Sequence, residues 1–588
     1  MEDEPDSLPA ISEPGPEGSG SLESEWTAGS VQPEPPTQGR TNWVKRLLVI
    51  VVALVVTGGI AAGAIIFLAL RGTEDVIDRM VPGDTTVYMT AYLDPAMQQK
   101  LNLRSLSKRF PKFASSEELN RLIDDALNDG LRDLGLSSTD VRPWLGTQMA
   151  ALVRVDGDQT MGAFLIASKE DAAATAALAK IRTGPEGSAA TWKEQEHDGV
   201  TISVGSVADG PDMVYALVDR VVVLATDAAI VEEVIDTATG KISSLRESAD
   251  FAATQGPLPQ ERVALVYVNI RPLVEKLKQA LTEGGEIDIS QISSSFGQLD
   301  ALTGLGATLS AEPTGIALDL NVGVDATRLT GEQKELLTEA PHENSVLSFT
   351  PKEAYGVFAL TGLRQTMQSS LDELAKDESF ADLDQELGLT EMVGHLTGDY
   401  GFEAAPGAAP IYAAEALLVG TEDDAGMQAF LDGLASKAAE ELESAFPDAP
   451  SLLFERTSYK GVTITYLPVN ELQEFGIVPA YAVSEGMTII ASSPDQVQAI
   501  LDARASGDSI AFSQNFIDAM GPRGASNNGM FYVDIEAVVS AYRNALPEDA
   551  RAQFDADDAP NLAPLKAFVF TSTNGANRTS VRWFLLIR

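Results

Sequence analysis

The chain repeats itself at a spacing of roughly 265 residues. The stretch GVTI at residues 199–202 returns at 461–464, and YALVDRVVVLATD at 215–227 returns as YAVSEGMTIIASS at 481–493. Both pairs keep their order along the chain. A collinear repeat of this length predicts two tandem modules with the same fold.

Each module contains a smaller pattern of two strands, a small residue, a hydroxyl residue and a helix. The strands are short and follow each other through short turns, which favours antiparallel pairing. Helices between groups of strands would then cover one face of each sheet. We therefore predict an α+β fold, with a single N-terminal transmembrane helix followed by two tandem duplicated modules of antiparallel sheet with covering helices.

The hydroxyl residue of this pattern recurs at four strand-to-helix turns. A Ser or Thr oxygen at such a turn accepts a hydrogen bond from an unpaired amide of the first helical turn. Its repetition at equivalent turns indicates a structural cap and not a catalytic nucleophile. The predicted helix caps are Ser168, Thr226, Thr421 and Ser492.

An uncharged apolar stretch begins at Leu47 and ends at Leu70. About 20 apolar residues suffice for a helix to cross the bilayer core. Arg40, Lys45 and Arg46 precede the stretch, and basic residues favour the cytoplasmic side. The stretch is too long, and starts too late, for a cleaved signal peptide. We therefore predict a single-pass signal anchor in the cell membrane, with a cytoplasmic N-terminus and an extracytoplasmic C-terminal body.

These features divide the chain into four predicted parts. They are a disordered acidic cytoplasmic tail (1–44), the transmembrane signal anchor (45–71), and two extracytoplasmic α+β modules (72–335 and 336–588). The tail is rich in Pro, Gly, Ser and Glu, a composition with too little apolar surface to fold. Gly59 and Gly63 form a G-x-x-x-G pattern in the span, which would let two helices pack as a homodimer.

Three short motifs after the apolar stretch are PGDTTVY at residues 82–88, LNLRSL at 101–106 and PWLG at 143–146. Together with the signal anchor, they resemble an uncharacterised bacterial membrane-anchored family, domain of unknown function thirty-three fifty-two. The resemblance implies a location and a fold type. It implies no chemistry, because the family carries no assigned activity or site residues.

The composition argues against several classes of function. A net charge of -45 would repel the phosphates of nucleic acid. The chain has no cysteine, and its three histidines, His197, His342 and His395, are scattered, which argues against a zinc site. The sequence holds no complete phosphate loop, dinucleotide turn or nucleophile elbow. We therefore predict no catalytic residue, no metal and no cofactor.

The anchor, the duplication and the lack of catalytic motifs predict a non-enzymatic protein of the bacterial cell envelope. Its extracytoplasmic part is predicted to be a binding or scaffolding module for an envelope protein, a wall polymer or a lipid. Two alternatives stay open. One is a carrier or sensor of a lipid or other apolar ligand, because a sheet covered by helices can enclose an apolar pocket. The other is an enzyme that uses only carboxylates.

Overall fold

The computed structural model describes residues 75–588, except 114–115, 133, 158, 208–211, 285–298, 330, 377, 408–412, 446–452, 469–476, 522–523 and 525. The predicted tail and the predicted span at residues 47–70, with Gly59 and Gly63, lie outside the described residues. Among the helices that are described, none is long and apolar enough to cross a membrane.

Antiparallel strands dominate the described part of the chain, and 20 of them form one sheet. The strands of its first half are β1 (Val87–Tyr92), β2 (Leu145–Asp156), β3 (Gln159–Ser168), β4 (Thr191–His197), β5 (Val200–Ser206), β6 (Met213–Val218), β7 (Val221–Ala225), β8 (Ala264–Asn269), β9 (Leu302–Glu312) and β10 (Gly315–Val324). The strands of its second half are β12 (Gly356–Leu360), β13 (Leu396–Pro406), β14 (Ala413–Thr421), β15 (Glu455–Tyr459), β16 (Val462–Tyr466), β17 (Ala480–Ser484), β18 (Met487–Ala491), β20 (Gly529–Asp534), β21 (Leu565–Gly575) and β22 (Arg578–Ile587).

Helices connect the strands in both halves. Those of the first half are α3 (Met97–Ser107), α4 (Ser116–Leu131), α5 (Ser138–Val141), α6 (Asp171–Ile181), α7 (Ala228–Ala238), α8 (Ala249–Gln255) and α9 (Ile270–Gly284). Those that follow are α11 (Gly331–Thr338), α12 (Leu363–Leu374), α13 (Glu378–Leu387), α14 (Leu389–Gly394), α15 (Asp424–Ala445), α17 (Pro494–Ser506), α18 (Gln514–Met520), α19 (Ile535–Ala545), α20 (Glu548–Asp557) and α21 (Ala559–Leu562). The short strands β11 (His342–Glu343) and β19 (Ser526–Asn527) pair separately.

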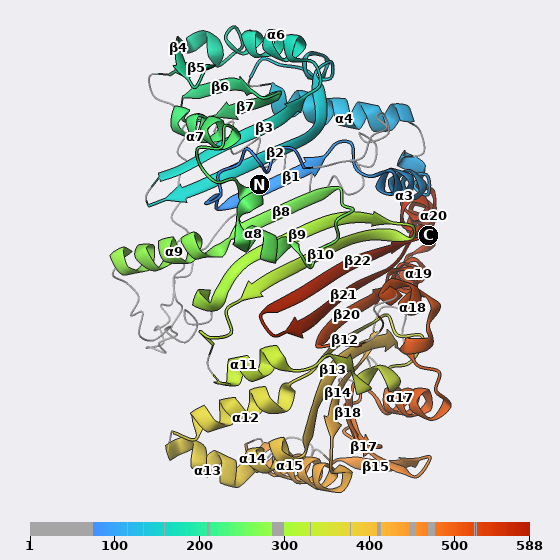
Figure 1. The fold of residues 1–588 in the computed structure, drawn as a ribbon. Coiled ribbons are helices and arrows are strands. Elements are labelled where there is room, and N and C mark those ends of the chain that lie inside the picture. Colours follow the sequence, from blue (N-terminus) through green and yellow to red (C-terminus); the bar gives the residue numbers. More distant parts are fainter. Residues whose placement is uncertain are drawn as a thin grey trace, which may run out of the picture. The chain divides into compact units, whose positions relative to one another are not determined.

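The two halves of the sheet have the same strand order, read from each edge to the centre. The pairings give the order β4-β5-β6-β7-β3-β2-β1-β8-β9-β10-β22-β21-β20-β12-β13-β14-β18-β17-β16-β15. Each strand of the first half therefore has a counterpart at the same place in the second half. Figure 1 shows β10 and β22 side by side where the halves meet.

The centre of the sheet lies on a local twofold axis. When β10 and β22 are aligned from their first residues, Asp319 corresponds to Arg582. These same two residues lie directly opposite each other in the register of the sheet, so the axis passes between them. Their side chains form an ion pair of 3.0 Å and are largely buried. The repeat in the sequence thus appears in the fold as two symmetric halves of one sheet.

One face of the sheet is covered by helices in both halves, and we call it the covered face. In the first half, α7 and α8 lie in front of the sheet in Figure 1, and Leu152, Ile230 and Phe251 belong to one buried core there. In the second half, α17 and α18 contribute Ile500 and Phe516 to an equivalent core. The opposite side of the sheet is called the open face.

The structure confirms an α+β fold with a large antiparallel sheet and covering helices. The division into modules at residues 72–335 and 336–588 stays a prediction, because the two halves share a continuous sheet through β10 and β22.

Candidate functional site

A row of apolar side chains crosses the open face of the second half. Its residues lie directly opposite one another on neighbouring strands from β18 to β22, and directly opposed residues of an antiparallel pair project to the same face. We call the following residues the apolar row: Ile490, Leu417, Phe402, Phe358, Phe531, Phe570 and Trp583. All except the partly buried Phe570 are 37–43% exposed. Large apolar side chains exposed side by side are unusual on a protein surface.

The first half carries a counterpart of this row in the same register. The equivalent residues are Leu224, Phe164, Ala151, Met89, Val266, Ala307 and Leu320. Here helices cover the strands, because Leu131 of α4, Val141 of α5 and Leu178 of α6 pack in one buried core with Phe164 and Leu224. In the first half, the open face is therefore covered over β7, β3, β2 and β1.

The difference arises from the packing of α15, the counterpart of α6. Helix α6 buries Ala174 and Leu178 in the core that contains the first-half row. Helix α15 instead contributes Met427 to a core with α12, α13 and α14, and this core reaches the strands at Val419 and Val483 beside the row. The described helices of the second half thus leave the apolar row exposed.

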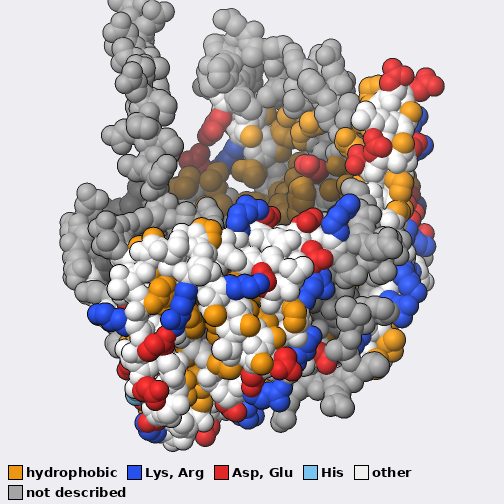
Figure 2. All heavy atoms as spheres, turned by 90° about the horizontal axis from the view of Figure 1, so that it is seen from above, with side chains coloured by type: hydrophobic (Ala, Val, Ile, Leu, Met, Phe, Trp, Pro, Cys, Tyr) orange, Lys and Arg blue, Asp and Glu red, His pale blue; other side chains and the backbone are white. Residues whose placement is uncertain are grey.

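The apolar row is long enough to hold an extended hydrocarbon chain. Neighbouring strands lie about 4.8 Å apart, so the aromatic part from Phe402 to Trp583 extends about 19 Å. An acyl chain in one leaflet of a bilayer spans about 15 Å, half of the hydrocarbon core. Ring centroids of Phe570 and Trp583 are 6.4 Å apart. Figure 2 shows a hollow in which hydrophobic side chains gather.

Two equivalent helices also keep apolar side chains in contact with solvent. Helix α9 follows β8 and exposes Leu273 and Leu277, and α19 follows β20 and exposes Val538 and Tyr542. Residues four positions apart lie on the same side of a helix, so each helix presents an apolar stripe. No residue of α19 is buried.

The first described residue, Asp75, is fixed to the sheet. Its carboxylate accepts hydrogen bonds from the Tyr92 hydroxyl at 2.9 Å, from Gln148 Nε2 at 2.6 Å and from the Tyr88 hydroxyl at 3.3 Å. Burial, together with this carboxylate, raises the pKa of both tyrosines, so they remain protonated donors. Only residues 71–74 separate Asp75 from the predicted span.

The predicted helix caps lie at the expected turns, but two of them are displaced by one residue. Helix α7 is capped by Asp227 and not by Thr226, and α17 is capped by Ser493 and not by Ser492. The reason is that the N-cap is the residue immediately before the helix. From that position a side-chain oxygen can accept a hydrogen bond from an amide of the first helical turn. The Ser492 hydroxyl accepts instead from the Glu415 amide of β14 at 3.0 Å.

At the other two turns, each predicted hydroxyl accepts a hydrogen bond from an amide that lies before the helix. Ser168 accepts a hydrogen bond from the Glu170 amide, and Thr421 accepts one from the Asp423 amide. Each of these amides is two residues further along and precedes the helix. These residues shape the turn into the helix. The N-cap position of α6 is held by Glu170, two residues after Ser168, so the prediction that Ser168 is an N-cap is wrong.

Each histidine pairs with a different carboxylate: His197 with Asp236 at 2.8 Å, His342 with Asp399 at 2.7 Å and His395 with Asp423 at 3.5 Å. Within the described ranges, His197, Asp198 and Asp236 come close enough together to hold a metal ion. Lys241 forms ion pairs with both of these carboxylates. Its ammonium group therefore already supplies the positive charge at this cluster.

A family model described as "Protein of unknown function (DUF3352)" matches residues 48–586 of the chain. No curated protein matches the chain. Among solved structures, "Structure of crystal form III of TP0453" is similar with a TM-score of 0.23 and 8% identity, over 45% of this chain and 86% of that chain. Crystal form IV of TP0453 gives a TM-score of 0.21 and 9% identity, over 42% and 79%. Likenesses this weak establish no function.

Proposed function

We propose, from the premise that this chain belongs to the DUF3352 family of proteins of unknown function, that it binds the acyl chain of a lipid at the bacterial cell envelope. The apolar row carries this proposal. All its residues except the partly buried Phe570 are exposed in the second half, whereas the equivalent residues Leu224, Phe164 and Met89 are buried under helices in the first half. Equivalent positions of the sheet are thus packed in the folded core of the first half and exposed to solvent in the second half.

The chemistry of the row favours an apolar and linear ligand. Apart from the indole nitrogen of Trp583, its side chains carry no polar atom, so they offer almost no hydrogen bond to a peptide or a sugar. Removing apolar surface from water contributes about 25 cal/mol per Å². A hydrocarbon chain laid along the rings would gain this term without leaving a buried polar group unpaired.

The proposed location brings this surface close to its ligand. In our proposal, the span at residues 47–70 anchors the protein in the cell membrane, and the body from residue 72 onward is extracytoplasmic. Five residue steps join Leu70 to Asp75, which is fixed to the sheet by Tyr92 and Gln148. A fully extended chain of this length covers at most about 18 Å. Such a tether would hold the body of the protein near the membrane that supplies the lipid.

Trp583 provides a direct test of a ligand on the row. We expect a stearate dibrominated in mid-chain to quench part of the tryptophan fluorescence of the full-length protein in phosphatidylcholine nanodiscs. The Trp583→Phe variant should lose this quenchable part, because bromine quenches only on contact. Trp144 is 2% exposed, and its emission should not change. The difference between the two proteins isolates Trp583 from the tryptophans near the predicted span.

A second variant separates ligand binding from simple proximity to lipid. The triple change Phe358→Ser, Phe402→Ser and Phe531→Ser keeps Trp583 but removes the rings on which the chain would lie. We expect it to abolish quenching of Trp583 while circular dichroism stays unchanged, since these rings are exposed. Quenching that is equal in the triple variant and in the parent protein would contradict the proposal.

Other parts of the function stay proposals of the same kind. We propose that the protein is not an enzyme, and turnover by the purified chain, including carboxylate-only hydrolysis, would contradict this. A scaffold for an envelope protein or wall polymer is the alternative if no lipid binds. A homodimer through Gly59 and Gly63 lies outside the described residues, and cross-linking of a Gly59→Leu, Gly63→Leu variant in membranes would decide it.

A further inference from the structure

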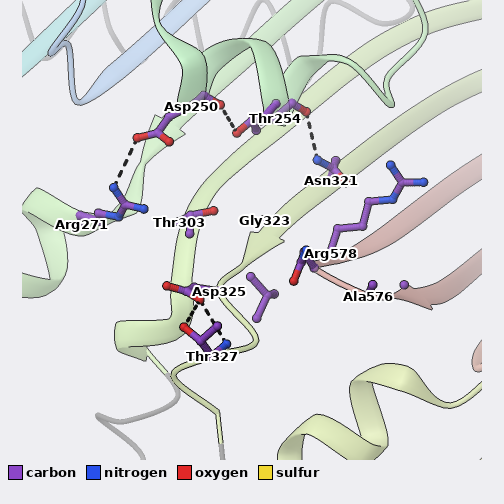
Figure 3. A pocket seen from close by; sticks show the side chains of 14 residues that line it. Asp250, Thr254, Arg271, Thr303, Asn321, Gly323, Asp325, Thr327, Ala576 and Arg578 are labelled. Atoms are coloured by element: carbon purple, nitrogen blue, oxygen red, sulfur yellow. Dashed lines mark hydrogen bonds and ion pairs between the residues drawn. The ribbon is translucent and has the colours of Figure 1, made fainter.

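A cavity of about 720 Å³, lined by polar and charged residues together with small apolar ones, lies on the covered face near the centre of the sheet. It is formed where β9 begins and β10 ends, beside α8, the start of α9 and the hairpin between β21 and β22. Figure 3 shows Arg271 and Arg578 on opposite sides of this cavity, with Asn321 and Thr254 above Gly323. The cavity and the apolar row therefore occupy opposite faces of the same sheet.

Asn321 is the deepest polar group of the cavity. It is 2% exposed, and its Nδ2 donates to the Thr254 carbonyl at 3.0 Å. Its Oδ1 has no hydrogen-bond partner within the described structure. A buried acceptor without a donor costs about 1–3 kcal/mol, so this oxygen indicates that a donor enters the cavity from outside the chain.

The acidic residues of the cavity are already engaged, which leaves positive charge for a ligand. Asp250 pairs with Arg271 at 3.4 Å. Asp325 accepts from both the amide and the hydroxyl of Thr327, and these bonds lower its pKa. Arg578 is exposed at the rim of the cavity. Asp325 also pairs with Arg328 at 3.3 Å, so Arg578 supplies the positive charge that an anion would meet here, in a protein whose net charge of -45 otherwise repels anions.

The twofold counterpart of this cavity is filled, which shows how the cavity is made. The position of Asn321 is taken by Phe584 in the second half, and that of Gly323 by Leu586, and both belong to the buried core. Opposite them stands Gly315, the counterpart of Arg578. A Cβ at Gly315 would lie 2.6 Å from the Phe584 ring. At the cavity, small residues of β10 thus meet an arginine of β22, whereas at its counterpart large residues of β22 meet a glycine of β10.

We propose that this cavity binds a small hydroxylated phosphate, with the phosphate on Arg578 and a hydroxyl group donating to Asn321 Oδ1. Arginine binds phosphate through two parallel hydrogen bonds, and on the opposite side of the cavity the ion pair of Arg271 with Asp250 adds no net charge. The same chemistry occurs in a free polyol phosphate and in the headgroup of a glycerophospholipid. The inference goes beyond the proposed function and does not depend on it, because the apolar row is on the other face.

Calorimetry on the full-length protein in phosphatidylcholine nanodiscs tests this site, with glycerol 3-phosphate and inorganic phosphate as probes. We expect glycerol 3-phosphate to bind more tightly than inorganic phosphate, because only the first can also donate to Asn321. Arg578→Gln, an exposed change, should weaken both probes about tenfold or more. Asn321→Leu should remove the preference for glycerol 3-phosphate and leave the affinity for inorganic phosphate nearly unchanged.

The matched control is Arg588→Gln in the filled counterpart, where Arg588 pairs with Asp518; it should change neither affinity. Dihexanoyl phosphatidylglycerol then distinguishes the two sources of the ligand. Displacement of glycerol 3-phosphate by this soluble lipid assigns the site to a lipid headgroup, and no displacement assigns it to a free polyol phosphate. Failure of glycerol 3-phosphate to bind, or binding that survives both Arg578→Gln and Asn321→Leu, would overturn the proposal. Neither result bears on quenching of Trp583.

Discussion

Replacing Glu403 with glutamine is expected to stabilise the protein at pH 9 by about 5 kcal/mol and to leave its stability at pH 4 nearly unchanged. Glu403 lies on the covered face of β13 and is completely buried. Its Oε1 accepts a hydrogen bond from Gln496 of α17, while its Oε2 has no partner in the described structure. Burial raises the pKa of Glu403 to about 8, so the carboxyl carries a proton in the folded protein at neutral pH.

The sign of the pH dependence follows from this raised pKa. Below about pH 4.5 the carboxyl is protonated in both the folded and the unfolded chain, and it does not affect stability. Between about pH 4.5 and 8 only the folded chain keeps the proton, so the free energy of unfolding falls as the pH rises. Each pH unit costs up to about 1.4 kcal/mol. Glutamine removes this loss and keeps the hydrogen-bonding capacity toward Gln496.

The equivalent position in the first half shows which residues fit this environment without a charge. In the register of the sheet, Leu152 corresponds to Glu403, and Ile230 of α7 corresponds to Gln496 of α17. Both apolar residues are buried in the first-half core. The double variant Glu403→Leu, Gln496→Ile should therefore also lose the pH dependence, because it transfers an apolar pair that already packs in this fold.

Thermal unfolding of the parent protein and the variants between pH 5 and pH 9 measures the effect. Glu415→Gln, on the neighbouring strand β14, is the matched control, because its side chain is exposed and its charge stays in water. It should follow the parent protein at every pH. If the Glu403→Gln variant and the parent lose stability in parallel from pH 5 to pH 9, Glu403 is not the group that titrates.

The duplication and the antiparallel α+β fold could be predicted from the sequence because both depend on local patterns. Short strands, turns and hydroxyl residues recur in order, and the sheet repeats them in the same order. The exposure of the apolar row could not be predicted this way. The strands VVVLA (β7) and MTIIA (β18) look alike, yet Leu224 is buried and Ile490 is exposed, because only the packing of α6 and α15 distinguishes them.

The cavity on the covered face left a signal in the sequence that a residue-by-residue comparison of the repeats could have found. Asn321 and Phe584 occupy the same repeat position, as do Gly323 and Leu586. A polar or small residue facing a large apolar residue in the duplicate indicates that the packing of the two copies differs there. The cap positions depend on where each strand ends, within one or two residues, and local sequence does not determine this.

Leu224→Ala is expected to destabilise the protein by about 2–4 kcal/mol, whereas Ile490→Ala should cost less than about 1 kcal/mol. The two residues hold equivalent positions on β7 and β18 and differ little in size. Leu224 is 5% exposed and packs under the helices of the first half, so its truncation leaves a cavity. Ile490 is 40% exposed, and its truncation removes surface that solvent already reaches. Hydrogen exchange of the β7 and β18 amides reports the two effects separately.

The same pair of variants separates folding from ligand binding. If the row holds an acyl chain, Ile490→Ala should weaken quenching of Trp583 by the dibrominated stearate, since the row becomes shorter at its β18 end. Leu224→Ala should leave the quenching intact at temperatures where the variant remains folded, because its side chain faces helices and not the ligand. A large loss of amide protection in β18 after Ile490→Ala would show that a helix or another segment packs on this face. The row would then be part of the folded core and could not serve as the lipid site.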